Sequence, residues 1–481
     1  MSSYKQELIK GVFWSAIEKY SGLIVSIIVS MVLARILSPK EFGIVAIATV
    51  IINFLQMFCT MGIGPAIIQK DLTQKELNSI FTFSLSIGII LALLFYNSSQ
   101  LISTFYENEQ LTIICKILSI QLIFASMNII PNALMAKNKR FKEIAKRTLL
   151  LQTSSGILSV IAALHGAGVY ALLISPIISS VGIFIWNIKY YKVHIDWTYD
   201  IKPIKSIFSF SLYQFLFEFV NYFSRNIDKL IIGRMLSIEA LGVYEKAYRL
   251  MQLPLQNVTS VINPVLQPVL RDLQNDKAIL AKKYMKIIRF VATISFPIGI
   301  ILSGMSTEII HLFFGGRWDA AIPIFSILAL SLPLQMILST SGSIYLITNN
   351  TKMQFWIGIR NTITTIAGFL IAALFFKTIE AMAWAWTITL VLNFIITYWL
   401  MYRYVLCQPI TSLIKEFIRP FVISIIVALT LFILNRITES NLLILNLIIK
   451  VCITLIVVLT TIQLLGQYDI FDYVKRKYIK K

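Results

Sequence analysis

Fourteen apolar stretches, each long enough to cross a lipid bilayer, occupy most of this chain. About 20 apolar residues in a helix span the hydrocarbon core, where only helices and closed barrels satisfy the backbone polar groups. The chain is 57% hydrophobic and its mean hydropathy is +0.78. We therefore predict an all-α polytopic membrane protein of about 14 transmembrane helices. The predicted spans are 11–36, 41–65, 77–97, 110–136, 143–164, 167–189, 206–234, 239–270, 284–305, 320–346, 353–376, 380–404, 415–435 and 442–466.

The distribution of positive charge predicts the topology. A charge at the end of a span is counted with the connection next to it. On this count, the two tails and the even-numbered connections hold 28 of the 43 lysines and arginines, whereas the odd-numbered connections hold 6. Positive residues favour cytoplasmic loops, so both termini are predicted to be cytoplasmic. The net charge of +20 then reflects topology. Scattered over many short loops, these charges do not form the basic face that nucleic-acid binding requires.

No connection is long enough for an extramembrane domain, and no nucleotide-binding loop of the Walker type is present. The four cysteines lie in or beside apolar segments without metal-ligand spacing, so we expect buried thiols, no metal and no cofactor. Any work on a substrate is therefore expected to occur within the membrane, without catalysis by a soluble domain.

An internal repeat divides the chain. The pattern Arg-x-Leu-Ser-x-x-x-x-Gly starts at Arg35 and again at Arg234, an offset of 199 residues. Six helices return a chain to its starting side, so the two copies share one orientation and are related by an axis along the membrane normal. Such parallel repeats form two lobes with a cavity between them, which suits alternating access.

These observations predict four segments. They are an N-lobe of helices 1–6 (1–190), a cytoplasmic interfacial linker (191–205), a C-lobe of helices 7–12 (206–405), and helices 13–14 with a basic cytoplasmic tail (406–481).

Two predicted helices carry polar stripes. At 100° per residue, the members of each stripe fall on one face of the helix. The seventh helix carries Gln214, Glu218, Asn221, Arg225 and Asp228, with Lys229 at the edge. The eighth carries Glu245, Arg249, Gln252, Gln256, Ser260, Asn263 and Gln267, with Lys246 next to Glu245. One charge at the bilayer centre costs about 3 kcal/mol, so both stripes are expected to face water or one another.

The stripes allow two interpretations. Arg225 with Asp228, and Glu245 with Arg249, have the spacing of local ion pairs that lower the cost of insertion. Alternatively, Arg225 and Arg249 lie at comparable depth in the outer half of the membrane and form an anion site, because guanidinium groups bind phosphate in a bidentate manner. Lys19 is a candidate cation in the opposite lobe, although its side chain could instead reach the cytoplasmic surface.

Three further segments carry a family resemblance. They are Asp228–Leu236 with Ala240–Tyr244 and Ala247–Leu250, Gly11–Ser15 with Leu33–Pro39, and Phe313–Trp318. Together they resemble the Wzx-type polysaccharide flippases of the multidrug/oligosaccharidyl-lipid/polysaccharide exporter superfamily, over nearly the whole chain.

This resemblance implies a substrate, partners and a location. The substrate would be an oligosaccharide on a polyprenyl pyrophosphate, moved across the bacterial cytoplasmic membrane in contact with membrane lipids and polysaccharide assembly proteins. The implied binding residues are Lys19, Arg225, Lys229, Lys246, Arg249, Gln252 and Gln256. The implied coupling residues for Na+ or H+ are Glu218, Asp228 and Glu245.

Two alternatives remain open. A small-molecule or drug exporter of the same superfamily would share the fold but have a less cationic cavity. A membrane-embedded polysaccharide polymerase would need catalytic carboxylates in a sizeable outer loop. The outer connections here are short, and Glu107, Glu109, Glu308 and Asp319 form no tight group in the sequence.

Overall fold

The structure is a computed structural model, and it describes residues 2–60, 63–195, 219, 222–223, 225–437 and 443–466. Its secondary structure in these ranges consists of helices joined by short turns, which confirms the predicted all-α class. The chain divides into two compact units, Met1–Gly242 and Val243–Lys481. The boundaries predicted for the two lobes, the linker and the tail stay predictions.

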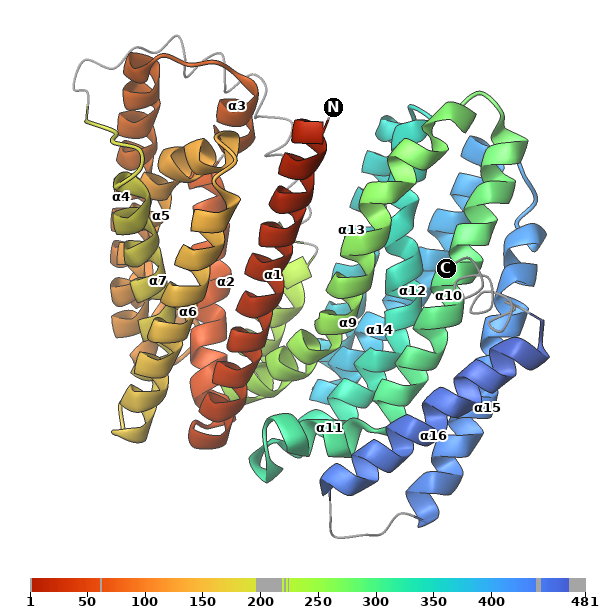
Figure 1. Cartoon of the computed structure of the whole chain (residues 1–481). Helices are drawn as coiled ribbons and strands as arrows, with labels where there is room; N and C mark the ends of the chain where they lie inside the picture. Colours follow the sequence, from red (N-terminus) through yellow and green to blue (C-terminus); the bar gives the residue numbers. More distant parts are fainter. Residues whose placement is uncertain are drawn as a thin grey trace. The chain divides into compact units, whose positions relative to one another are not determined.

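Unit 1 is a bundle of long helices (Figure 1). α1 packs on α6, α4 packs on α5, and α7 packs on both α5 and α6. Its elements are α1 (Ser2–Ile36), α2 (Pro39–Thr60), α3 (Ile63–Gln69), α4 (Gln74–Phe105), α5 (Gln110–Lys137), α6 (Phe141–Leu164), η1 (Gly168–Tyr170) and α7 (Ala171–Ile188). Residues 225–235 form a further helical segment of this unit.

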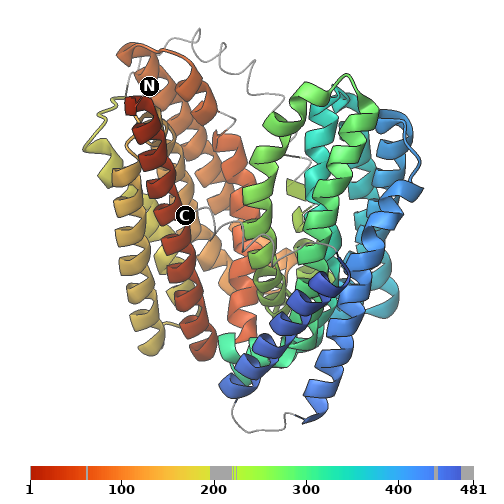
Figure 2. The ribbon, with the colours of Figure 1, turned by 45° about the vertical axis from the view of Figure 1, so that its right-hand side comes forward.

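Unit 2 contains most of α9 and the helices that follow it. α10 packs on α12 and α15, α14 packs on α12 and α13, and α16 lies obliquely against α15 (Figure 2). The elements are α9 (Ile238–Leu270), η2 (Arg271–Leu273), α10 (Lys277–Gly304), α11 (Ser306–Phe313), η3 (Gly316–Trp318), α12 (Ala321–Ile347), α13 (Thr351–Ile371), η4 (Ala372–Phe376), α14 (Ile379–Leu400), η5 (Met401–Leu406), α15 (Thr411–Ile437) and α16 (Leu443–Leu464).

Twelve helices among the described residues are long and apolar enough to cross a membrane. Two predicted spans are not among them. The span 206–234 falls largely outside the described residues, and the span 239–270 corresponds to α9, which is a continuous helix of 33 residues but carries the polar stripe. The count of fourteen therefore stays a prediction, while the multi-pass helical architecture is confirmed.

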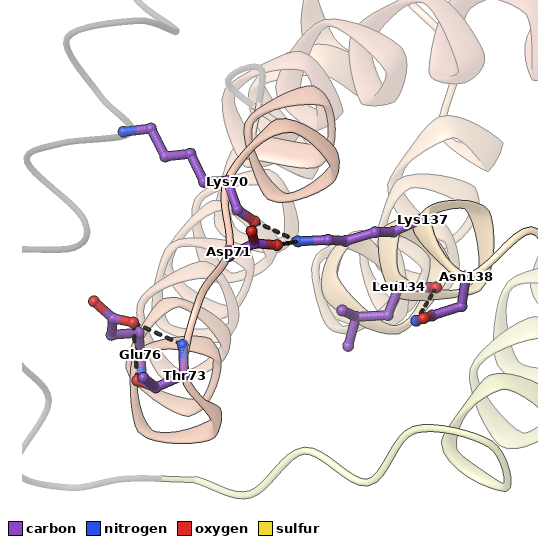
Figure 3. A network of polar contacts seen from close by, with 7 residues as sticks. All are labelled: Lys70, Asp71, Thr73, Glu76, Leu134, Lys137 and Asn138. Atoms are coloured by element: carbon purple, nitrogen blue, oxygen red, sulfur yellow. Dashed lines mark hydrogen bonds and ion pairs between the residues drawn. The ribbon is translucent and has the colours of Figure 1, made fainter.

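Charged and polar side chains fix the turns at one end of unit 1 (Figure 3). Thr73 caps α4: its hydroxyl accepts from the Glu76 amide, and the Glu76 carboxylate accepts from the Thr73 amide at 2.7 Å. Lys137 at the end of α5 donates to the Lys70 carbonyl and to Asp71 Oδ1, the latter at 3.0 Å. The Asp71 carboxylate is fully exposed, so this ion pair contributes at most about 1 kcal/mol. It positions the α3–α4 turn more than it stabilises the unit.

The two copies of the sequence repeat meet in unit 1 where α2 and α9 begin. A Cβ added to Gly43 would lie 1.8 Å from the carbonyl oxygen of Ile238, and one added to Gly242 would lie 1.9 Å from that of Pro39. The contact is thus reciprocal: the first residue of each helix faces the glycine four residues into the other. Glycine is required at both positions because any side chain would overlap backbone atoms. The last residue of the repeated pattern is therefore explained by a close helix crossing.

Replacing Gly242 by Ala should destabilise unit 1 by about 1–3 kcal/mol, because overlap with a carbonyl can be relieved only by moving a helix. The measurement is the thermal unfolding temperature of the purified protein in detergent. Gly358→Ala on α13 is the matched control, since a Cβ there meets nothing within 4 Å. Equal unfolding temperatures for the two variants would contradict the tight crossing.

Candidate functional site

Three predicted site residues lie on the helical segment 225–235 of unit 1. Arg225 is exposed, Asp228 is 1% exposed, and Lys229 is partly buried. Gln214, Glu218 and Asn221 of the same predicted stripe lie outside the described residues.

Arg234 anchors the end of this segment. Its Nη1 contacts Glu107 Oε1 at 2.9 Å, and its guanidinium carbon lies 5.3 Å from the centroid of the Phe105 ring. The neighbouring Tyr106 is buried, and desolvation raises its pKa to about 12 although the positive charge of Arg234 acts in the opposite direction. The arginine that begins the second copy of the repeat thus anchors the helix end to the turn after α4.

The remaining stripe residues lie on α9, in unit 2. Arg249 and Gln256 are exposed, Glu245 and Gln252 are partly buried, and Lys246 is 3% exposed. Their spacing along one continuous helix places Glu245, Arg249, Gln252 and Gln256 on one face, as predicted. The guanidinium of Arg249 is exposed, and guanidinium groups bind phosphate in a bidentate manner.

Lys246 lies against aromatic rings instead. Its Nζ is 5.4 Å from the centroid of the Phe314 ring and 6.0 Å from that of the Trp318 ring. Both rings are carried by the turn after α11, in which Gly315 adopts φ 83° and ψ 177°, a conformation essentially restricted to glycine. The segment Phe313–Trp318 that carries the family resemblance therefore surrounds a buried ammonium group.

Lys19, the candidate cation of the first helix, is exposed on α1, and its Nζ is 5.9 Å from the ring of the adjacent Tyr20. The preceding residue is held in place: Glu18 Oε1 accepts from the Thr148 hydroxyl of α6 at 3.2 Å. Glu18 therefore has a defined position inside unit 1, whereas the Lys19 side chain is exposed.

Arg147 is a buried cation whose charge was counted with the connection after the fourth helix. The residue falls within the predicted span 143–164, and the structure places it inside α6, where it is 4% exposed. Nη1 donates to Asn132 Oδ1 at 3.1 Å and also to Asn187 Oδ1. Asn187 in turn donates to Asn128 at 3.5 Å. The spacing of Asn128 and Asn132 by four residues on α5 was the available signal for such a site.

Two ion pairs in unit 2 join charged side chains on different helices. Lys450 of α16 pairs with Glu308 of α11, and Arg289 of α10 pairs with Glu416 of α15. The Lys450 and Glu308 side chains are only 5% and 13% exposed. Each pair attaches one of the two C-terminal helices to the rest of unit 2.

The described ranges contain no group of three or more His, Cys, Asp or Glu side chains placed to hold a metal ion. Of the predicted site residues, the structure places one group in unit 1 and another on α9 in unit 2. The shared cationic cavity and the assignment of binding and coupling residues stay predictions.

Comparison with known proteins identifies the chain's relatives. Residues 32–323 match the polysaccharide biosynthesis protein family. The chain is 28% identical to the teichuronic acid biosynthesis protein TuaB of Bacillus subtilis (strain 168), with 91% of each chain covered. It is 24% identical to the lipopolysaccharide biosynthesis protein WzxC of Escherichia coli (strain K12), covering 88% of this chain and 86% of that one.

Solved structures show the same fold. The lipid II flippase MurJ in an inward closed conformation superposes with a TM-score of 0.75 at 16% identity, over 95% of this chain and 99% of that one. An inward-facing multidrug resistance transporter of the MATE family gives 0.59 at 13% identity, over 82% and 96% of the two chains. The fold is therefore that of the exporter superfamily suggested by the sequence segments.

Proposed function

Since the chain belongs to the polysaccharide biosynthesis protein family, we propose that it flips a polyprenyl-pyrophosphate-linked oligosaccharide across the bacterial cytoplasmic membrane. The observation that carries this proposal is likeness over nearly full length, to TuaB and WzxC in sequence and to the lipid II flippase MurJ in fold. The resemblance to Wzx-type flippases stated from the sequence is thereby confirmed. The particular substrate is our proposal.

The cationic side chains give the proposal a binding mechanism. The pyrophosphate is bound by Arg225 and Arg249, which are both exposed, with Lys19, Lys229, Lys246, Gln252 and Gln256 as further candidates. Charge-assisted hydrogen bonds of this kind are about twice as strong as neutral ones. The polyprenyl chain stays in the lipid, so the protein needs to desolvate only the headgroup and the sugars.

Movement follows from alternating access. Rocking of the predicted N-lobe (1–190) against the C-lobe (206–405) would expose the headgroup to one side of the membrane and then the other, without covalent chemistry. Glu218, Asp228 and Glu245 are the proposed coupling residues for Na+ or H+. Both termini are expected in the cytoplasm, where polysaccharide assembly proteins supply the substrate.

Deleting the gene and extracting the lipids tests this function. A flippase predicts that lipid-linked repeat units accumulate on the cytoplasmic side and that surface polysaccharide is lost. Single repeat units that reach the outer side without being polymerised would favour the polymerase alternative. Unchanged surface polysaccharide with increased sensitivity to a small molecule would favour the exporter alternative.

A further inference from the structure

Unit 2 carries cationic side chains within several helices that are predicted to span the membrane, and three of them are Arg289, Arg360 and Lys450. Arg289 has Glu416 as its partner, and Lys450 has Glu308. Arg360 of α13 forms no ion pair within the ranges that the structure describes. One of the three charges is therefore held without a carboxylate.

The partners of Arg360 are all neutral. Its Nη2 donates to Asn361 Oδ1, and makes longer contacts with the carbonyl of Asn393 at 3.4 Å and the hydroxyl of Thr397 at 3.3 Å. Two other donors, Nε and Nη1, are buried and have no hydrogen-bond acceptor. Among the described residues, the guanidinium thus has two N–H groups without an acceptor and two long contacts that a better acceptor could replace.

The surrounding groups are arranged to support this charge. Asn361 Nδ2 donates to Thr397 Oγ1 at 3.4 Å, and Asn393 Nδ2 donates to the Asn361 carbonyl and to Thr365 Oγ1, each at 3.2 Å. These bonds join α13 to α14 and place amide and hydroxyl oxygens near the arginine. A network of this kind fixes the position of the guanidinium but does not neutralise its charge.

Burying this guanidinium without a carboxylate costs free energy unless an anion binds to it. A charged side chain at membrane depth costs about 3 kcal/mol on insertion scales, and buried donors without acceptors add to that cost. Arg289 and Lys450 avoid this cost by pairing with carboxylates. In the part of the chain that the structure describes, Arg360 has no carboxylate to offset this cost, as expected of a side chain whose counterion is part of a ligand.

Unit 1 contains a related arrangement. Arg147 of α6 is buried, donates to the amide oxygens of Asn132 and Asn187, and has a buried Nε without an acceptor. In the predicted repeat, α6 and α13 are the fifth helices of their lobes, and Asn187 and Asn393 both lie on the helix that follows. The two arrangements differ in that Thr148, next to Arg147, binds the carboxylate of Glu18.

We propose that Arg360, held by Asn361 and Thr397, is a phosphate-binding residue for the diphosphate headgroup of the transported lipid. The diphosphate oxygens accept from Nε and Nη1 and replace the long contacts to Asn393 and Thr397. This proposal rests on the proposed function, which supplies the diphosphate. It adds a binding residue on α13, outside the stripes of the seventh and eighth helices.

Asn361→Asp tests the proposal, because it keeps the acceptor for Arg360 and adds a carboxylate that cancels its charge. Asn361→Leu is the matched variant: it removes the acceptor but leaves the charge. The probes are polyprenyl diphosphate, inorganic diphosphate and uncharged polyprenol, titrated into the full-length protein in nanodiscs. We expect Asn361→Asp to weaken polyprenyl diphosphate binding by about 10- to 100-fold, and Asn361→Leu to weaken it much less.

The outcomes separate the two proposals. If the unaltered protein binds polyprenyl diphosphate and Asn361→Asp binds it equally well, Arg360 is structural and this inference is wrong. If the unaltered protein binds neither diphosphate probe more tightly than polyprenol, the proposed function fails as well. Tighter binding of the inorganic probe than of the lipid would assign the site to a free phosphate.

Two further variants serve as controls. Arg360→Gln must also lose binding, and it covers the case in which Asn361→Asp does not fold. Asn435→Asp controls for the effect of an added carboxylate elsewhere in unit 2.

Discussion

Replacing Arg249 by Gln is expected to abolish export of the surface polysaccharide while the protein remains folded in the membrane. Arg249 is exposed on α9, so its replacement removes no packing from the buried core of unit 2. Losing one partner of a hydrogen-bonded charge pair with the diphosphate costs about 2–5 kcal/mol, which is enough to remove transport. The measurement is surface polysaccharide in cells that carry only the variant, with membrane abundance determined in parallel.

The controls for this prediction separate charge from geometry. Arg249→Lys should retain partial export, because an ammonium keeps the charge but loses the bidentate geometry. Arg436→Gln removes another exposed arginine of unit 2, at the end of α15 where it contacts the Phe432 ring, and should export normally. Arg225→Gln is expected to behave like Arg249→Gln. Normal polysaccharide in both variants would remove these arginines from the binding site.

Replacing Glu308 by Ala is expected to prevent accumulation of folded protein. The change leaves the Lys450 ammonium buried in α16 without its carboxylate, and breaking a buried ion pair on one side costs about 3–5 kcal/mol. The measurement is the fraction of membrane-extracted protein that elutes as a single folded species in detergent, compared with the unaltered chain.

A double variant shows whether this pair acts in stability alone. Glu308→Gln with Lys450→Met removes both charges, and such replacements are often neutral or stabilising. We expect it to restore folded protein and export together. Restored folding without export would give the pair a part in transport, and full abundance of the Glu308→Ala single variant would contradict the buried pair itself.

Much of the fold could be predicted because the membrane imposes a simple local rule. The predicted spans 110–136 and 320–346 agree with α5 (Gln110–Lys137) and α12 (Ala321–Ile347) to within one residue at each end. Apolar runs that end at charges or turn residues specify such helices without reference to distant contacts. The short helices α3 and α11 were not predicted, because each is far shorter than a span and depends on packing against neighbouring helices.

The polar sites were harder to predict because their partners are distant in sequence. Lys450 and Glu308 are separated by 142 residues, so no local spacing connects them. Arg147 lies inside the predicted span 143–164, but its partners Asn132 and Asn187 lie on other helices, so the sequence around Arg147 did not indicate the site that they form. Arg360 contacts Asn393 and Thr397 of α14, which are more than 30 residues away in the sequence. The polar faces themselves were predictable from helical periodicity, as Glu245 and Arg249 on α9 illustrate.

Transport of a lipid-linked oligosaccharide by the purified protein tests the central claim most directly. The protein is reconstituted into liposomes with a polyprenyl-pyrophosphate oligosaccharide, and the fraction of sugar accessible to an externally added glycosidase is followed over time. We predict that the protein makes the initially protected inner-leaflet pool accessible, and that Arg249→Gln does so no faster than protein-free liposomes. A protected pool that stays constant with the unaltered protein, under both Na+ and H+ gradients, would contradict the account.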